Sequence, residues 1–244
     1  MNSKNLVIIP TFNEVENILI IIDKVLNLPL KFDILVVDDN SPDGTARVVS
    51  HHIKKNSKRI NLEIKNEKKG LGKAYIHGFM WGLSRDYENI FEMDADLSHD
   101  PKDLIEMCKC LENSECEVVI GSRYINGINV VNWPLNRIIL SYCASIYARI
   151  VTGIPVKDST SGFVGFKSEV LKSIDLKSIL FNGYAFQIEL KFKAFKNNYK
   201  IKEIPIIFKD REIGESKMSI NIFYEAFFGI LGMKIKSLLF PLKS

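Results

Sequence analysis

Short aliphatic runs alternate with polar segments along the first half of the chain. The runs 6–9 and 34–37 are aliphatic throughout, and both end at polar residues. Continuous aliphatic runs of this length are typical of parallel strands that are covered on both faces. Between them, Asn13 is placed to cap a helix that contains the apolar run 18–22. The pattern therefore predicts a strand, a helix and a second parallel strand.

The same alternation continues further along the chain. It predicts strands at 62–64, 90–93 and 118–120, and helices after 41–45, at 74–83 and from Asp100 or Pro101. Regular alternation of strands and helices is the signature of a doubly wound sheet. We therefore expect an α/β fold with a mostly parallel central sheet flanked by helices.

The second half of the chain has a different pattern. It predicts helices at 136–151 and 183–197, a Ser/Thr/Gly-rich loop at 158–165 and a strand at 204–208. Pro205 has no N–H to donate to a ladder, so we expect this strand at the edge of the sheet. No repeat or linker divides the chain, and we expect one catalytic domain, 1–219, followed by a C-terminal segment, 220–244.

The C-terminal segment is apolar but interrupted. Asn221, Glu225, Lys234 and Lys236 break the run, whereas a helix that spans a membrane needs about 20 mostly apolar residues. Phenylalanines and leucines flanked by lysines are typical of a helix that lies in the membrane interface. A helix packed on the core of the domain would show a similar amphipathic pattern, and this alternative stays open.

Composition narrows the class of protein. The 244 residues are 46% apolar and 25% charged, enough for one sizeable core. The net charge of +4 suits an anionic substrate or an anionic membrane surface, but it is too small for a nucleic-acid interface. Cys108, Cys110, Cys116 and Cys143 lack paired spacing and neighbouring histidines, so we expect reduced thiols and no zinc site.

Acidic residues follow three of the predicted strands, at the edge where a doubly wound sheet builds its binding site. They are Glu14, Asp38, Asp39, Asp94 and Asp96. Asp94 and Asp96 are separated by one residue, which places both carboxylates on the same side of an extended backbone. Hard oxygen ligands favour Mg²⁺ or Mn²⁺, and such a cation would bind the pyrophosphate of a substrate. A solvated loop is the alternative for this motif by itself.

Two basic features point to further anions. Residues 68–73 (KKGLGK) form a basic entry to a helix, where backbone N–H groups can approach a phosphate. The spacing fits neither a P-loop nor a dinucleotide-binding glycine fingerprint, which counts against an oxidoreductase, and a solvated helix start is the alternative. Arg123, Arg137, Arg211 and Lys217 lie in or beside polar loops. Their convergence would create a second anion site, although each alone would be an ordinary surface charge.

Seven ordered blocks of the sequence resemble the dolichol-phosphate (polyprenol-phosphate) mannose synthases. The blocks are 10–14 (PTFNE), 36–45 (VVDDNSPDGT), 93–99 (MDADLSH), 121–124 (GSRY), 133–137 (WPLNR), 183–189 (GYAFQIE) and 211–217 (REIGESK). That family consists of inverting family 2 glycosyltransferases with the GT-A fold. The blocks span nearly the whole chain and are far more specific than a pair of aspartates.

The resemblance implies GDP-mannose as the donor, a polyprenyl phosphate as the acceptor, and Mg²⁺ or Mn²⁺ as the cofactor. Near the nucleotide sugar it places Pro10, Phe12, Glu14, Asp39, Lys73, Asp94, Ala95 and Asp96, with Phe12 where a tyrosine is usual. It assigns the metal to Asp94 and Asp96, and Ser98 stands where some relatives have a glutamine that completes the metal shell. It assigns the acceptor phosphate to Arg123, Arg137, Ser141, Arg211 and Lys217.

Catalysis is therefore expected to depend on Asp96, Arg123 and Arg137. The enzyme is expected at the cytoplasmic face of a membrane, with or without a membrane partner subunit. The block 158–163 resembles a family motif with a local change, and no role is assigned to it. A related transferase that uses UDP-glucose or UDP-GlcNAc, with a polyprenyl phosphate or a sugar as acceptor, is one alternative. A non-catalytic subunit that binds nucleotide sugars is another.

Overall fold

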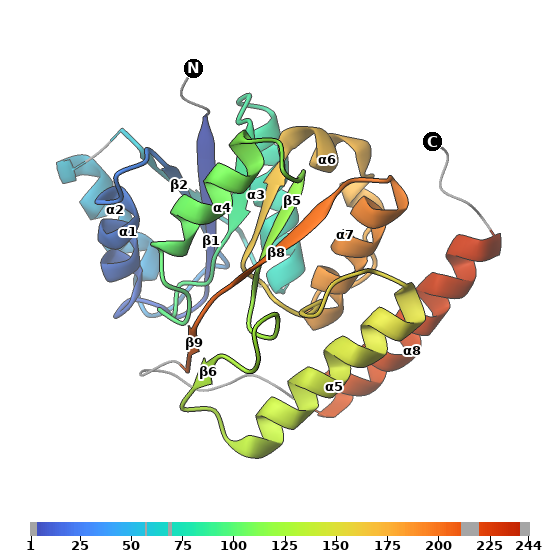
Figure 1. The fold of residues 1–244 in the computed structure, drawn as a ribbon. Coiled ribbons are helices and arrows are strands. Elements are labelled where there is room, and N and C mark those ends of the chain that lie inside the picture. Colours follow the sequence, from blue (N-terminus) through green and yellow to red (C-terminus); the bar gives the residue numbers. More distant parts are fainter. Residues whose placement is uncertain (1–3, 57, 68–69, 211–219, 240–244) are drawn as a thin grey trace.

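A seven-stranded sheet forms the centre of the protein (Figure 1). The computed structural model describes residues 4–56, 58–67, 70–210 and 220–239. The strand order is β3-β2-β1-β4-β7-β5-β8. The strands are β1 (Asn5–Thr11), β2 (Asp33–Asp38), β3 (Ile60–Ile64), β4 (Asn89–Glu92), β5 (Val118–Ser122), β7 (Val164–Lys167) and β8 (Ile201–Pro205). Only β7 runs antiparallel to its neighbours in this sheet, so the expectation of a mostly parallel sheet is confirmed.

Helices cover both faces of the sheet. They are α1 (Ile18–Leu26), α2 (Thr45–Asn56), α3 (Leu71–Leu83), α4 (Asp103–Glu112), α5 (Leu135–Thr152), α6 (Ser168–Ser173), α7 (Tyr184–Lys196) and α8 (Ile220–Leu239). Alternate residues of β1 point to opposite faces, because side chains alternate along a strand. Ile8 packs in the cluster under α3, α6 and α7, whereas Ile9 packs in the cluster under α1, α2 and α4. This two-sided burial explains why the strand is aliphatic throughout.

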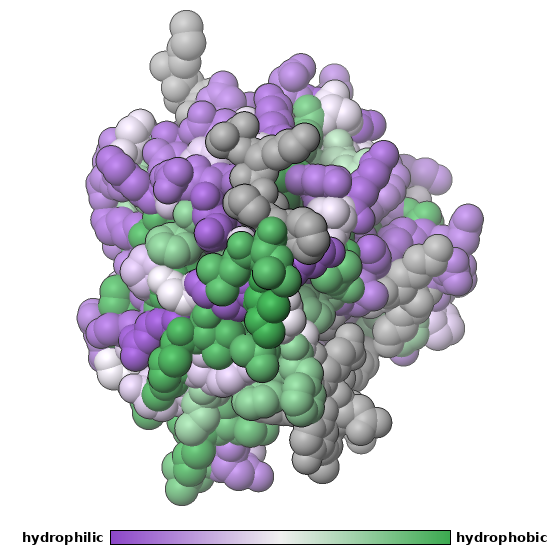
Figure 2. Space-filling model, turned by 90° about the vertical axis from the view of Figure 1, so that its right-hand side faces the viewer, coloured by the Kyte–Doolittle hydropathy of each residue, from purple (hydrophilic) through white to green (hydrophobic). Residues whose placement is uncertain are grey.

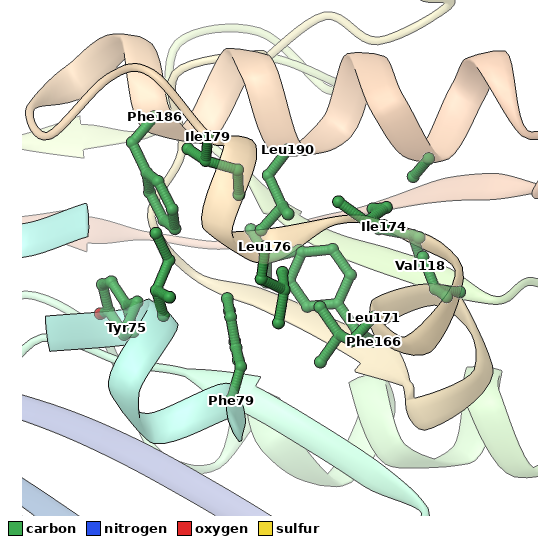
Figure 3. Close-up of a cluster of buried hydrophobic side chains, with 14 of the residues drawn as sticks. Tyr75, Phe79, Val118, Phe166, Leu171, Ile174, Leu176, Ile179, Phe186 and Leu190 are labelled. Atoms are coloured by element: carbon green, nitrogen blue, oxygen red, sulfur yellow. The ribbon is translucent and has the colours of Figure 1, made fainter. Parts of the chain in front are cut away.

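Aromatic side chains fill the core beneath α3 and α7 (Figure 3). Phe79 meets Phe166 edge to face at a centroid distance of 5.8 Å, and Tyr75 stacks on Phe186 at 6.2 Å. Two glycines let α3 lie directly on β1 here. A Cβ on Gly78 would come within 2.7 Å of the Ile8 side chain, and one on Gly82 within 2.8 Å of Leu6. The close approach fixes α3 against the strand.

Two local expectations are corrected by the structure. Asn13 does not cap the first helix, because α1 begins at Ile18 and residue 13 adopts a positive φ of 61° in the preceding turn. Residues 204–208 do not form one strand. β8 ends at Pro205 on the edge of the sheet, as expected, and Phe208 then begins β9 (Phe208–Lys209), which pairs with β6 (Val130–Val131) in a separate two-stranded sheet.

Two long helices, α5 and α8, run side by side along one flank of the molecule (Figure 1). α8 also packs against α7, and its Ile230 and Met233 side chains are buried there. Within the described part of the chain, no helix combines the length and hydropathy that crossing a bilayer requires.

We predict that Gly78→Ala lowers the free energy of unfolding by about 1–3 kcal/mol, because the added methyl group overpacks the contact between α3 and β1. Urea denaturation followed by circular dichroism measures the change. Gly232→Ala is the matched control, since a Cβ there meets nothing within 4 Å. It should leave stability unchanged or raise it by up to about 1 kcal/mol, because alanine favours the helix. Equal stability of Gly78→Ala and wild type would contradict this account of the packing.

Candidate active site

One pocket of about 350 Å³ opens beside the carboxyl ends of β4 and β5. This is the edge at which a doubly wound sheet binds its ligands. The pocket has three kinds of wall: acidic residues after β4, basic residues from the β5 loop and α5, and an apolar side from α5, α7 and α8. Five of the residues predicted from sequence line it together, namely Asp94, Asp96, Arg123, Arg137 and Ser141.

The acidic wall holds its two carboxylates in place by hydrogen bonds. The Tyr75 hydroxyl donates to Asp94 Oδ1 at 3.3 Å, and the Ser98 backbone N–H donates to Asp96 Oδ1 at 3.1 Å. Burial, reinforced by the charge of Asp94, raises the pKa of Tyr75 well above its ordinary value, so its phenol keeps the proton that it donates. Ala95, between the two aspartates, is buried.

The donor chemistry of this wall fits a hard divalent cation. Both aspartates line the pocket and present carboxylate oxygens, the ligands that Mg²⁺ and Mn²⁺ prefer. In the described ranges, no third carboxylate, imidazole or thiol joins them in a metal-binding group. One or two carboxylates are the usual protein contribution to a Mg²⁺ site that is completed by water and substrate phosphates.

His99 also lines the pocket beside the acidic pair, although sequence reasoning gave it no role in the site. The Asp94 backbone N–H donates to His99 Nδ1 at 3.3 Å, and the ring stacks on Phe163 at a centroid distance of 4.6 Å. Burial lowers the pKa of His99 to about 4. The imidazole is therefore neutral, and because Nδ1 is an acceptor its proton lies on Nε2. Its position directly after the acidic loop was the signal in the sequence.

The other residues expected near the nucleotide sugar, Pro10, Phe12, Glu14, Asp39 and Lys73, are not among those that line this pocket. Pro10, Phe12 and Glu14 are in and after β1, and Asp39 follows β2; β1 lies between β2 and β4 in the sheet. Asp39 forms an ion pair with Lys65 at 2.8 Å. Lys73 lies in the first turn of α3, partly exposed.

Two polar groups near these residues already have hydrogen-bond partners within the protein. Asp38 is fully buried and accepts hydrogen bonds from the Thr11 hydroxyl at 2.8 Å and from the Ser41 hydroxyl at 2.6 Å, so it joins the loops after β1 and β2. At the start of α3, the Gly72 N–H donates to the Asn182 carbonyl at 2.9 Å. That N–H is therefore occupied. Residues 68 and 69 of the basic helix entry lie outside the described residues.

Arg123 forms the centre of the basic wall and is only 7% exposed. Its Nε and Nη2 donate to the two carboxylate oxygens of Asp158, both at 2.7 Å, and Nη2 also donates to the Thr160 hydroxyl at 2.8 Å. Burial alone would raise the pKa of Asp158, but the Arg123 guanidinium holds it below its ordinary value. Asp158 is thus ionised and forms a two-pronged ion pair, the strongest geometry for this pair of groups.

Arg137 adds a second guanidinium from the first turn of α5. It stacks over the Trp133 ring at 4.1 Å, and its Nη1 donates to Asp210 Oδ1 at 2.9 Å. Ser141, one turn further along α5, accepts a hydrogen bond from the Tyr124 hydroxyl at 2.8 Å. Arg211 and Lys217, which were also expected at the acceptor phosphate, lie outside the described residues.

The third wall of the pocket is apolar. Its side chains come from three helices: Leu140, Cys143, Ala144 and Tyr147 on α5, Ile188 on α7, and Phe227 and Ile230 on α8. Tyr147 and Phe227 stack at a centroid distance of 4.4 Å, and the Tyr147 hydroxyl donates to the Phe227 carbonyl at 2.7 Å. These contacts join α5 to α8 at the apolar wall.

Known proteins share both the sequence and the fold. Residues 6–175 match the family model described as glycosyl transferase family 2. The chain is 41% identical to the polyprenol monophosphomannose synthase of Mycolicibacterium smegmatis, over 93% of this chain and 85% of that protein. It is 40% identical to the undecaprenyl-phosphate mannosyltransferase of Micrococcus luteus, over 91% of this chain and 90% of that protein.

Two solved structures show the fold. Glucosyl-3-phosphoglycerate synthase from Mycobacterium tuberculosis, solved with Mn²⁺, UDP and glucosyl-3-phosphoglycerate, superposes with a TM-score of 0.67 at 14% identity, over 96% of this chain and 79% of that one. S. aureus TarS in complex with UDP-GlcNAc superposes with a TM-score of 0.66 at 18% identity, over 99% and 68%. The expected GT-A fold is confirmed. With the family model and the two mannosyltransferases, it identifies the chain as a member of glycosyl transferase family 2, in the group of the polyprenol-phosphate mannose synthases.

Proposed function

We propose that this enzyme transfers mannose from GDP-mannose to a polyprenyl phosphate, with inversion at the anomeric carbon, at the cytoplasmic face of a membrane. The observation that carries the proposal is the composition of one pocket, in which an acidic pair, two guanidinium groups and an apolar wall face a common space. The names of the two bacterial relatives supply the mannose and the polyprenyl phosphate.

The basic and apolar walls together suit an amphiphilic acceptor. Arginines bind phosphate through paired N–H groups, so Arg123 and Arg137 are the groups to receive the phosphate of the acceptor, with the Ser141 hydroxyl beside them. The apolar wall then takes the hydrocarbon next to that phosphate, because burial of hydrocarbon is favourable by about 25 cal/mol per Å². A sugar acceptor would leave the apolar wall without a function.

The acidic wall suits the donor. Asp94 and Asp96 would hold Mg²⁺ or Mn²⁺, and the cation, when bound, supplies positive charge that stabilises the departing nucleoside diphosphate. Asp39 and the loop of Pro10, Phe12 and Glu14 lie next to that wall through the order β2-β1-β4. We assign the nucleotide to these loops, because a nucleotide held there would have its diphosphate beside the aspartates and its sugar towards the basic wall.

The chemistry then requires positioning more than proton transfer. A lipid phosphate is already anionic at neutral pH and attacks the anomeric carbon without a strong general base. The acceptor and the donor diphosphate repel each other, and this repulsion would oppose their approach in the absence of fixed positive charge. Arg123 and Arg137 provide that charge on the acceptor side. Arg137 must exchange its ion pair with Asp210 for the phosphate.

The outer surface of α5 and α8 suits the membrane. Apolar side chains gather in the lower part of the face shown in Figure 2. The exposed apolar residues of these two helices include Leu135, Ile139, Ile150, Phe228, Leu231, Ile235, Leu238 and Leu239. α8 therefore buries its inner side against the domain and leaves an apolar outer side, so packing and membrane contact are compatible. We assign 220–244 to membrane association, next to the catalytic domain 1–219.

Asp96→Asn should lower mannose transfer by about 100-fold or more, because one charged ligand of the cation is lost. The assay follows label from radiolabelled GDP-mannose, UDP-glucose and UDP-GlcNAc into mild-acid-labile lipid, with added Mg²⁺ or Mn²⁺. Chelation of the metal should abolish wild-type transfer, and either ion should restore it. The matched control is Asp100→Asn in the same loop, an exposed position that should keep full activity. Label that enters lipid only from a UDP-sugar would refute GDP-mannose as the donor. Full activity of Asp96→Asn would refute the role of Asp96 as a ligand of the cation.

Arg137→Ala should lower kcat/KM for the polyprenyl phosphate by about 100-fold, because loss of a two-pronged charged contact to phosphate costs about 3 kcal/mol. The affinity for GDP, measured by calorimetry with the metal present, should be unchanged. Arg149→Ala on the same helix is the control, because this exposed side chain lies outside the pocket. Equal losses in the two variants, or an equal loss of GDP affinity in Arg137→Ala, would exclude the acceptor role.

The double variant Phe228→Ser/Leu238→Ser should weaken binding to anionic vesicles by at least about tenfold, since each exposed side chain contributes about 1–2 kcal/mol when it enters the bilayer surface. Co-sedimentation with phosphatidylglycerol vesicles measures the binding. Ile64→Ser is the control, because Ile64 is an exposed aliphatic residue on β3, the strand at the opposite edge of the sheet from β8. If both proteins sediment like wild type, the outer surface of α5 and α8 is not the membrane contact.

A further inference from the structure

The loop that carries Asp158, residues 153–163 between α5 and β7, is hydrogen-bonded to two neighbouring strands. Glu203 on β8 accepts the Lys157 N–H at 2.8 Å through Oε2 and the Asp158 N–H at 2.9 Å through Oε1. The Ser161 hydroxyl donates to the Gly121 carbonyl of β5 at 2.7 Å. The start and the middle of the loop are therefore fixed to neighbouring strands.

Lys191 fixes the same loop from α7. Its side chain is fully buried, and its Nζ donates to the Ser161 carbonyl at 2.6 Å, the Ser159 carbonyl at 3.0 Å and Gln187 Oε1 at 3.4 Å. An ammonium group has three N–H donors, so these acceptors use its full capacity. Burying a charge costs several kcal/mol unless it is paired and hydrogen-bonded. The three hydrogen bonds offset this cost, and they tie the Lys191 side chain to the loop.

Charges of alternating sign continue from Lys191 to the pocket. Burial lowers the pKa of Lys191, and the neighbouring Glu92 and Asp158 oppose that shift. Asp158 itself is fully buried and does not line the pocket, whereas its partner Arg123 does. An effect of Asp158 on a phosphate in the pocket is therefore transmitted by Arg123, whereas Lys191 also contacts Gln187, which lines the pocket itself.

The hydrogen bonds of Asp158 determine where the guanidinium lies. Its Oδ2 accepts both the Nε and the backbone N–H of Arg123, at 2.7 and 2.9 Å, while Oδ1 accepts Nη2 at 2.7 Å. Three bonds from one carboxylate fix the plane and the rotation of the arginine side chain. Thr160, from the same loop, adds a fourth bond to Nη2.

We propose that Lys191 and Asp158 are positioning residues for Arg123. The Lys191 ammonium holds the backbone of 158–161, and the Asp158 carboxylate on that backbone holds the guanidinium in the wall that receives the acceptor phosphate. This inference rests on the proposed function for the identity of the anion. It goes beyond that function by giving the motif at 158–163 and a buried lysine of α7 a role in acceptor binding.

A double-mutant cycle tests the proposal. Lys191→Met and Asp158→Asn are each made in the wild-type chain and in an Arg123→Gln chain, in which the amide still offers Asp158 a hydrogen bond. Each variant should lower kcat/KM for the polyprenyl phosphate about 10- to 100-fold in the wild-type chain, since misplacement of a catalytic group by about 1 Å costs up to about 100-fold. In the Arg123→Gln chain the further loss should be below about threefold, because the group that they position is gone.

Two measurements separate positioning from simple support of the fold. The affinity for GDP with Mn²⁺ should change by less than about twofold in every variant, while the Kd for farnesyl phosphate should rise in parallel with the loss of kcat/KM. Lys196→Met, at the exposed end of the same helix, is the control for removal of a lysine and should behave like wild type. If Lys191→Met does not fold by circular dichroism, Asp158→Asn decides alone.

The outcomes are distinct from those that test the proposed function. Equal losses in the wild-type and Arg123→Gln chains, or wild-type affinity for farnesyl phosphate in Asp158→Asn, would overturn the positioning role. Failure of wild type to transfer mannose would overturn the proposed donor, but the cycle on farnesyl phosphate binding needs no turnover and would still be read. If Lys191→Met and Asp158→Asn weaken farnesyl phosphate binding in the chain with Arg123 but cause no further weakening in the Arg123→Gln chain, the proposal is supported.

Discussion

The proposed reaction brings two anions together in one pocket, and the arrangement of charge around that pocket suits this constraint. Carboxylates after β4 line one side, and guanidinium groups from the β5 loop and α5 line another. Opposite charges on separate walls allow a cation-bound diphosphate and a lipid phosphate to be held apart from water and close to each other. The acidic wall follows β4 and the basic wall follows β5, two strands that are separated in the sheet by β7 alone, so the fold itself sets the distance between the charges.

Rigid packing beneath the pocket keeps the charged groups in place. β1 and β4 are neighbours, and both are buried on two faces by helices. Gly78 allows α3 to lie against Ile8, and Tyr75 from the same helix reaches Asp94. A catalytic group held by a packed helix and a central strand loses little freedom when substrate binds, and this preorganisation is the main contribution that a scaffold makes to catalysis.

Sequence reasoning predicted the elements whose residues share one environment along their whole length. The aliphatic runs of β1 and β2 are buried on both faces, so their composition alone indicates parallel strands. The acidic pair was predictable because it directly follows such a strand. Pairings across the chain were not predictable: Arg123 and Asp158 are 35 residues apart, and only the antiparallel insertion of β7 brings them together. Lys191 lies in a helix with two other lysines, and the pattern does not show which of the three is buried.

For the proposed polyprenyl phosphate, α5 offers a route from the membrane surface to the polar pocket. Arg137 and Ser141 line the pocket from this helix, Leu140 and Tyr147 line its apolar wall, and Ile139 and Ile150 are exposed on its outside. An acceptor that remains partly in the bilayer can therefore contact one continuous element from the membrane surface to the phosphate site. The helix offers apolar contact along the path and positive charge at its end, so the lipid phosphate leaves water only where guanidinium groups replace its hydration.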